Sequence, residues 1–202
     1  MCLQRIYCLL ACSNDRSDQG AQIKTQQIAR AGLCVALLAV SAWVSVPLGP
    51  IPFTLQTMTL ALIPAVLDRP TAILAVAVYL LLGAIGLPVF SGFSGGVMRL
   101  VGPTGGFLWG FLVGMIVATT LVRLLPQTMP FFARVLAGDV ALLVISYVCG
   151  TAQLMVVGSM GVAPAMAAAV LPFILPDAAK LAIGAGVGCA VDKALSSTLF
   201  RA

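Results

Sequence analysis

Residues 31–67, AGLCVALLAVSAWVSVPLGPIPFTLQTMTLALIPAVL, form a run of 37 residues without a charged side chain. As a single helix this run would be about 55 Å long at ~1.5 Å per residue, whereas the hydrocarbon core of a bilayer is only ~30 Å thick. Proline breaks a regular helix, and the middle of the run holds Pro47, Gly49, Pro50 and Pro52. The run therefore predicts two membrane crossings separated by a break.

The composition of the whole chain indicates a membrane protein. Of its 202 residues, 61% are hydrophobic and only 8% are charged, with a mean hydropathy of +1.11. A soluble domain usually carries about a quarter charged residues. The composition therefore argues against a soluble enzyme, a nucleic-acid-binding protein and a disordered chain.

The same composition leaves little for catalysis. The six acidic residues are all Asp, and the chain contains no His, the commonest general base and metal ligand. The sequence holds no phosphate-binding loop of the G-x-x-x-x-G-K-[ST] type and no pattern typical of a catalytic triad. We expect no catalytic residue, no metal and no cofactor.

The remaining apolar runs predict four further crossings, which makes six in all. The last of them is expected to begin at Pro176, because proline suits the first residue of a helix. A short apolar segment, 165–171, lies between two prolines and is not counted as a crossing. The chain is therefore predicted to be an all-α, polytopic integral membrane protein. After the first helix, the expected crossings are 53–67, 70–87, 104–122, 136–157 and 176–195.

The basic residues set the orientation. Six crossings place both termini on one side, and the excess of Lys and Arg marks the cytoplasmic side. With both termini in the cytoplasm, nine of the eleven basic residues lie inside, and only Arg99 and Lys180 lie toward the outside. Residues 1–27 are predicted to be a cytoplasmic tail and residues 28–202 the membrane domain. The tail has little structure-forming pattern, so an over-extended translation start is an alternative.

The strongest candidate site is Asp177-Ala-Ala-Lys180, at the start of the last predicted helix. Positions i and i+3 lie on one face of a helix, and the positive end of the helix dipole favours an acid there. Ionisable residues in membrane segments usually face a cavity. A ligand site is the favoured interpretation, and an ion pair at the membrane interface is the alternative.

A glycine-rich stretch, 83–106, forms the second candidate. Such a loop can fold back over a pocket and present backbone amides to a ligand. Arg99 lies within it, and Thr104 is a plausible N-cap for the fourth predicted crossing. The alternative is a flexible outer loop with Arg99 among lipid headgroups. Apolar ring faces nearby come from Phe90, Phe93, Phe107 and Trp109.

Two weaker features lie earlier in the chain. Gln56, one turn into the second predicted helix, requires a partner in a membrane, and a hydrogen bond to another helix is favoured over a ligand contact. Small residues in the first predicted helix share one face, which allows a close approach of another helix or of a partner subunit. These small residues are Ala29, Gly32, Ala36 and Ala39.

Three segments together resemble the BioY family, the biotin-specific substrate-binding (S) components of energy-coupling-factor (ECF) transporters. They are Pro52–Thr57, the stretch from Tyr79 to Phe90 with its continuation Gly102-Pro-Thr-Gly-Gly-Phe107, and Pro172-Phe173-Ile-Leu-Pro176-Asp177-Ala-Ala-Lys180. The resemblance covers about residues 28–198. It implies a six-helix fold in the prokaryotic cell membrane and a high-affinity biotin site open to the outside.

The resemblance also implies partners and residue roles. A membrane T component and two ATPase subunits would supply the energy, with Ala29, Gly32 and Ala36 matching the face that contacts the T component. Lys180 would bind the biotin carboxylate, with Arg99 as a second candidate for that role. Asp177 would accept hydrogen bonds from the ureido N–H groups or orient Lys180. Second-rank pocket candidates are Gln56, Tyr79, Phe90, Phe93 and Trp109.

Three other hypotheses stay open. The chain could be an S component for a different vitamin, with the same architecture and a different pocket. It could be a self-sufficient biotin carrier that needs no ATPase. It could also be a structural or assembly-type membrane protein whose loops bind nothing.

Overall fold

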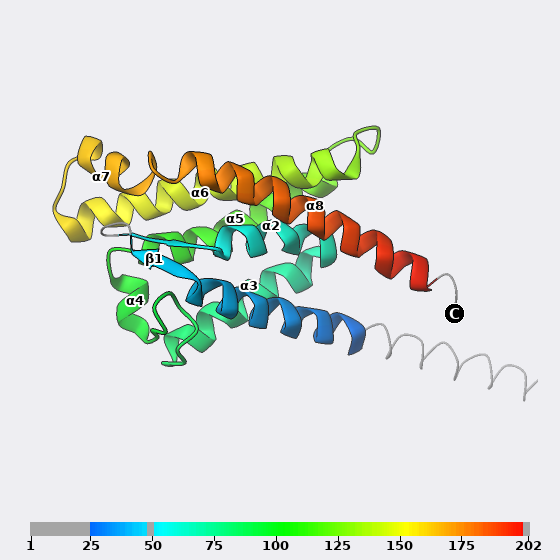
Figure 1. Cartoon of the computed structure of the whole chain (residues 1–202), viewed down its shortest axis with the longest axis horizontal. Coiled ribbons are helices and arrows are strands. Elements are labelled where there is room, and N and C mark those ends of the chain that lie inside the picture. The colour runs from blue at the N-terminus through cyan, green and yellow to red at the C-terminus, as the bar shows by residue number, and fades with distance from the viewer. Residues whose placement is uncertain (1–24, 48–50, 200–202) are drawn as a thin grey trace, which may run out of the picture.

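The computed structural model describes residues 25–47 and 51–199, which form an elongated, mostly helical bundle (Figure 1). The predicted tail, 1–27, falls mostly outside this part of the chain. The elements are a first helix at Thr25–Trp43, β1 (Ser45–Pro47), β2 (Pro52–Thr54), α2 (Gln56–Val66), α3 (Arg69–Ala84), α4 (Val97–Val101), α5 (Gly105–Leu124), α6 (Phe131–Gly158), α7 (Val162–Ala169) and α8 (Ile174–Leu199).

Four of these helices are long and apolar enough to cross a membrane: the first helix, α5, α6 and α8. The second and third predicted crossings correspond to α2 and α3, which have 11 and 16 residues. At ~1.5 Å per residue these helices are about 16 and 24 Å long. A mostly helical protein with several membrane-spanning segments is therefore confirmed.

The break in the first apolar run is a β-hairpin, so the prediction of a purely helical chain needs a correction. Strands β1 and β2 pair antiparallel, with Pro47 opposite Pro52. Prolines favour an extended backbone and donate no hydrogen bond, which suits the last pair of so short a ladder, next to the turn. Because β2 takes residues up to Thr54, α2 begins at Gln56 rather than at residue 53.

The predicted helix starts differ from the observed ones by a few residues near proline. Helix α8 begins at Ile174 instead of Pro176, and most of the short apolar segment 165–171 belongs to α7, which begins at Val162. In both helices the proline lies in the first turn, where its missing N–H leaves no hydrogen bond unmade. Thr104 occupies the N-cap position of α5 as predicted, although its side chain makes no capping hydrogen bond.

Glycines on α5 allow it to pack very close to α6. A Cβ atom on Gly106 would lie 2.2 Å from the Cys149 carbonyl oxygen, and one on Gly110 would lie 2.6 Å from the Ser146 Cα. The glycines are four residues apart, so they share one face of the helix. Small residues at such spacing allow backbone-to-backbone packing in membranes. This contact fixes the positions of α5 and α6, which both supply residues to the cavity described below.

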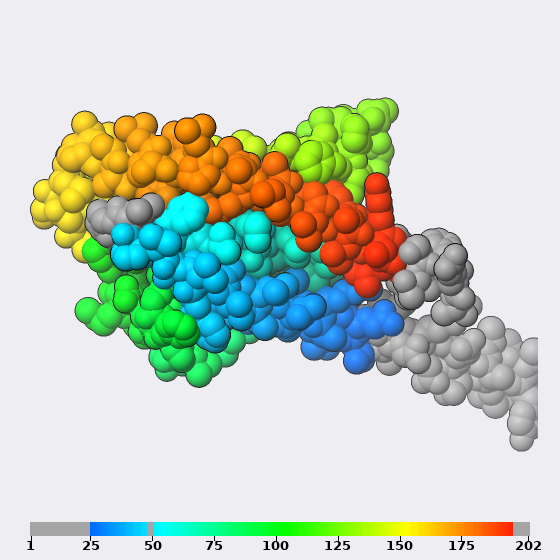
Figure 2. All heavy atoms as spheres, in the orientation of Figure 1, coloured from blue at the N-terminus to red at the C-terminus, as the bar shows by residue number. Residues whose placement is uncertain are grey.

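The bundle has two distinct ends. In Figure 1 the hairpin, α4 and α7 lie at one end, and the first helix begins and α8 finishes at the other. Figure 2 shows the first helix and α8 exposed along the face in view. The large number of exposed Leu, Ile and Val side chains on these helices is expected for a surface that contacts lipid.

Candidate functional site

A single cavity gathers residues from distant parts of the chain. Its empty volume is about 730 Å³, part of which is open to solvent. The hairpin, α2, the loop after α3, α4, α5, α6, α7 and α8 all contribute to its lining. Five of the site residues predicted from the sequence line the cavity: Gln56, Phe90, Arg99, Asp177 and Lys180.

Asp177 and Lys180 form the buried polar centre of the cavity. The two side chains are 6% and 8% exposed, and the Lys180 Nζ lies 2.7 Å from the Asp177 Oδ1. The predicted ion pair is therefore present, but inside the protein rather than at an exposed interface. Both residues come from the first two turns of α8, where the helix dipole favours the acid.

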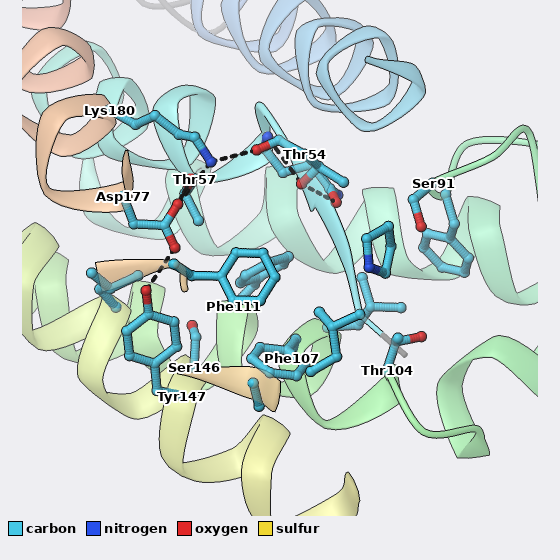
Figure 3. A pocket seen from close by; sticks show the side chains of 18 of the residues that line it. Thr54, Thr57, Ser91, Thr104, Phe107, Phe111, Ser146, Tyr147, Asp177 and Lys180 are labelled. Carbon is cyan, nitrogen blue, oxygen red and sulfur yellow. Dashed lines mark hydrogen bonds and ion pairs between the residues drawn. The ribbon is translucent and has the colours of Figure 1, made fainter. Parts of the chain in front are cut away.

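Three donors converge on the Asp177 carboxylate (Figure 3). Oδ1 accepts hydrogen bonds from Lys180 Nζ at 2.7 Å and from the Thr57 hydroxyl at 3.0 Å, and Oδ2 accepts one from the Tyr147 hydroxyl at 2.7 Å. The donors come from α8, α2 and α6. A carboxylate offers about four acceptor positions. One position therefore remains for a further N–H or O–H donor.

Lys180 is held on three sides. Besides Asp177, its Nζ donates to the Thr54 carbonyl oxygen at 2.7 Å and lies 3.5 Å from the centre of the Phe53 ring. An ammonium group has three N–H donors, and an aromatic face attracts a cation. The β2 strand thus engages this cation through a backbone carbonyl and an aromatic ring.

An apolar wall from α5 adjoins the polar centre. Phe107, Leu108 and Phe111 line the cavity at helical spacing, and Thr104 continues the same face toward the start of α5. In Figure 3 the rings of Phe107 and Phe111 lie between the Asp177 side of the cavity and the side with Ser91 and Thr104. The cavity therefore has a charged, hydrogen-bonded side, an apolar middle and a second polar side.

Arg99 lies on α4, five residues before Thr104, and is the second cation of the cavity. Its side chain makes no hydrogen bond or ion pair with any residue in the described part of the chain. The two basic residues that the charge distribution placed outside, Arg99 and Lys180, are thus the two that line the cavity. Lys180 is engaged by the protein, whereas Arg99 is available to an anion.

Gln56 makes the helix-to-helix hydrogen bond that was predicted, from the first residue of α2 rather than one turn into it. Its Nε2 donates to the Tyr79 hydroxyl at 2.7 Å, and that hydroxyl donates to the Val89 carbonyl oxygen at 3.0 Å. Tyr79 is 1% exposed and packs edge-on against Phe90. Tyr79 therefore lies behind the cavity wall and supports the loop after α3.

Two aromatic candidates lie away from the cavity lining. Phe93 is 65% exposed and stacks on Trp43 with ring centroids 5.0 Å apart. Trp109 is 45% exposed. It is two residues after Phe107, so it points to roughly the opposite side of α5. Trp43 also donates from Nε1 to the Pro88 carbonyl oxygen at 2.7 Å, so Phe93 and Trp43 hold the outside of this loop.

The small-residue face of the first helix is uncovered. Ala29, Gly32 and Ala36 are exposed, whereas Ala39 is buried. A Cβ atom on Gly32 would meet no other atom within 4 Å. Within the described chain, these three residues therefore do not serve close internal packing.

The sequence analysis missed several cavity residues. Tyr147 and Ser146 lie in a long apolar helix without a local sequence motif. Only the folded structure shows that both line the cavity. Phe107 was named from the sequence as an apolar ring near the loop, and Phe111 could have been found, because its spacing of four residues from Phe107 continues the face begun by Thr104. In the part of the chain that the structure describes, no group of His, Cys, Asp or Glu residues is placed to hold a metal.

Comparisons with known proteins give one consistent result. The sequence profile of the BioY family matches residues 15–197. The biotin transporter BioY of Thermotoga maritima is 42% identical over 168 residues, 83% of this chain and 96% of the relative. Biotin transporter BioY2 of Lactococcus lactis subsp. cremoris is 36% identical, covering 82% and 90% of the two chains.

A solved structure shares the fold. The crystal structure of an S-component for biotin from an ECF-type ABC transporter superposes with a TM-score of 0.78, covering 85% of this chain and 93% of that one. The sequence identity in this pair is 21%. This likeness supports the arrangement of the helices.

Proposed function

The chain belongs to the BioY family, and we propose that it binds biotin in the cavity described above as the substrate-specific subunit of an ECF-type transporter. It serves biotin uptake and is not itself an enzyme. The observation that carries the proposal is the order of the cavity walls, which runs from the Asp177–Lys180 pair through an apolar middle to a second polar side with Ser91 and Thr104. Arg99, on α4 five residues before Thr104, also lines the cavity. Biotin has the matching order of groups: a polar ureido ring, an apolar thiophane ring and chain, and a carboxylate.

Asp177 is the proposed acceptor for a ureido N–H. Three of its about four acceptor positions are filled by protein donors, and the fourth is free for the ligand. The neighbouring Lys180 balances the charge of the carboxylate and fixes its orientation. Phe107 and Phe111 supply apolar surface for the thiophane ring and chain.

Arg99 is the proposed partner of the ligand carboxylate. Two of the three N–H donors of Lys180 already serve Asp177 and the Thr54 carbonyl oxygen, and its ammonium lies 3.5 Å from the centre of the Phe53 ring, so at most one donor remains for a ligand carboxylate. Arg99 has no such competing partner in the described chain. A guanidinium group also matches a carboxylate with two parallel hydrogen bonds. This assignment leaves Lys180 with a role at the ureido side.

We further propose six membrane crossings, with both termini in the cytoplasm. The common end at which the first helix begins and α8 finishes (Figure 1) is compatible with an even number of crossings. Nine of eleven basic residues then lie inside, in agreement with the positive-inside rule. Helices α2 and α3 are short, so the hairpin and the loop after α3 would complete their crossings of the bilayer. The cavity would then open toward the outer face of the cell membrane.

The energy for uptake would come from other subunits, a T component in the membrane and two ATPases. The exposed face of Ala29, Gly32 and Ala36 supports this proposal, because small exposed residues allow another helix to approach closely. Uptake in cells that lack all ATPase partners would instead favour a self-sufficient carrier.

Calorimetry on the detergent-purified chain tests the proposed function. We expect 1:1 binding of biotin and no heat from other vitamins, such as thiamine and riboflavin, at the same concentrations. Binding of another vitamin in place of biotin would move the chain to a different substrate within the same architecture. A folded, monodisperse sample that binds none of them would contradict the proposal.

A further inference from the structure

Helix α4, which carries Arg99, is too short to hold itself in place. It has five residues, Val97–Val101, and isolated helices of this length are unstable. Its start is tied to α3, because the Gly96 N–H donates to the Gly83 carbonyl oxygen at 2.7 Å. Its end needs donors from outside the helix, because the last carbonyls of a helix have no donor within it. One such donor is the Gly105 N–H, 3.0 Å from the Gly102 carbonyl oxygen, and the Leu100 carbonyl oxygen needs another.

Gln153 of α6 supplies that donor and anchors the end of α4. Its Nε2 donates to the Leu100 carbonyl oxygen at 3.0 Å and to the Gly102 carbonyl oxygen at 2.7 Å. One side-chain amide has two N–H donors, and both are used on carbonyls 51 and 53 residues away in the sequence. The Leu100 carbonyl belongs to the residue that directly follows Arg99.

The surrounding packing leaves room for this contact and for little else. A Cβ atom on Gly105 would lie 1.9 Å from the Leu100 carbonyl oxygen and 2.7 Å from Gln153 Nε2. A Cβ atom on Gly106 would lie 2.8 Å from Gln153 Cβ. The two glycines at the start of α5 therefore let the Gln153 side chain reach the end of α4.

Gln153 is not itself among the residues that line the cavity. We propose that Gln153 is a positioning residue for the carboxylate end of the substrate site, acting through α4 on Arg99. The inference rests on the proposed function, in which Arg99 binds the ligand carboxylate. Without the anchor, α4 would sample several positions, and ordering it on binding would cost affinity. The loss would fall on ligands that use Arg99 and would spare ligands that lack a carboxylate.

The test compares two ligands, biotin and biotinol, in which the carboxylate is replaced by a primary alcohol. Calorimetry measures both ligands on the wild type, Arg99→Ala, Gln153→Met and the double variant. Gln153→Met keeps the length of the side chain and removes both donors. Gln127→Met, in an exposed loop, is the matched control. Gln153→Glu, which keeps the shape, replaces the Met variant if the latter does not yield a monodisperse protein.

We expect Gln153→Met to weaken biotin binding about ten-fold, which corresponds to the net loss of one or two hydrogen bonds. Biotinol binding should change less than two-fold, and the double variant should bind biotin no more weakly than Arg99→Ala alone. An equal loss for both ligands, or additive losses in the double variant, would overturn the inference and leave the proposed function standing. If Arg99→Ala itself keeps the wild-type preference for biotin over biotinol, the carboxylate assignment fails, and the role of Gln153 fails with it.

Discussion

Two buried aspartates of this chain show how differently a membrane protein can hold an acid. Asp177 is 4% exposed and accepts hydrogen bonds from Lys180, Thr57 and Tyr147. Asp139 is fully buried, and neither of its carboxyl oxygens has a hydrogen-bond partner among the described residues. Burial alone therefore does not mark the proposed binding site. The converging donors and the adjoining cavity mark it.

The surroundings of the two acids explain this contrast. Asp139 lies on α6 one turn from Val135 and one turn from Leu143, which pack against apolar residues of α2 and α8. It is absent from the cavity walls. Asp177 instead lies beside a cation on the same helix and faces the cavity. We therefore propose that Asp177, and not Asp139, binds the ligand.

The largest effect is expected at the cation beside Asp177. Lys180→Ala leaves a buried carboxylate without its counter-charge, which typically costs about 3–5 kcal/mol. We expect biotin affinity in calorimetry to fall at least 100-fold and the midpoint of thermal unfolding to fall with it. Lys193→Ala, on an exposed part of the same helix, is the control and should keep wild-type affinity. Wild-type affinity in Lys180→Ala would remove the distinction between the two acids.

The next largest effect is expected at Arg99, the second cation of the cavity. Arg99→Ala should weaken biotin binding by about ten-fold or more, the usual worth of a charge-assisted hydrogen bond. Its thermal unfolding should stay close to that of the wild type, because the side chain is exposed and makes no hydrogen bond or ion pair within the described chain. Competition of labelled biotin by unlabelled biotin measures the loss. An unchanged affinity would return the carboxylate to Lys180.

A change at the second acid should alter stability and leave binding intact. Asp139→Leu replaces an unpartnered buried carboxyl group with an apolar group that branches at the same carbon. Removing a buried polar group without a partner should raise the free energy of unfolding by about 1–2 kcal/mol. Thermal unfolding in detergent, with and without biotin, provides the measurement. A loss of biotin affinity in a stable Asp139→Leu protein would give Asp139 a part in the site.

The smallest effect is expected from one of the donors to Asp177. Tyr147→Phe removes the hydrogen bond to Oδ2 at 2.7 Å and leaves Lys180 and Thr57 in place. A single hydrogen bond contributes about 1 kcal/mol, so biotin affinity should fall roughly five-fold. A loss as large as that of Lys180→Ala would mean that Tyr147 contacts the ligand directly.

The sequence predicts the charged residues of the candidate site better than its aromatic residues. Arg99 and Lys180 could be found because the positive-inside rule leaves them unexplained, and Asp177 follows from its spacing to Lys180. Tyr147 and Gln153 could not be found, because their partners lie on other elements and no local pattern announces them. Phe93 and Trp109 are aromatic residues near the loop, but the direction in which each ring points depends on the fold, so the sequence does not tell whether it faces the cavity.

The fold was predictable to the level of helices and less so at their junctions. Long apolar runs predict α5 and α6 within about five residues, and Pro176 predicts the start of α8 within two residues. The hairpin was missed because prolines and glycines announce a break without specifying its conformation. The close packing of α5 on α6 through Gly106 and Gly110 is visible in the sequence as small residues four apart.

The most direct test of the central claim, that Asp177 and not Asp139 binds the ligand, is a side-by-side titration of Asp177→Asn and Asp139→Asn with biotin. Each change keeps the shape of the side chain and removes one carboxylate acceptor. The account predicts that the Asn at position 177 weakens biotin binding at least 30-fold, while the Asn at position 139 leaves it within two-fold of the wild type. Equal affinities in the two variants, or a larger loss at position 139, would contradict it.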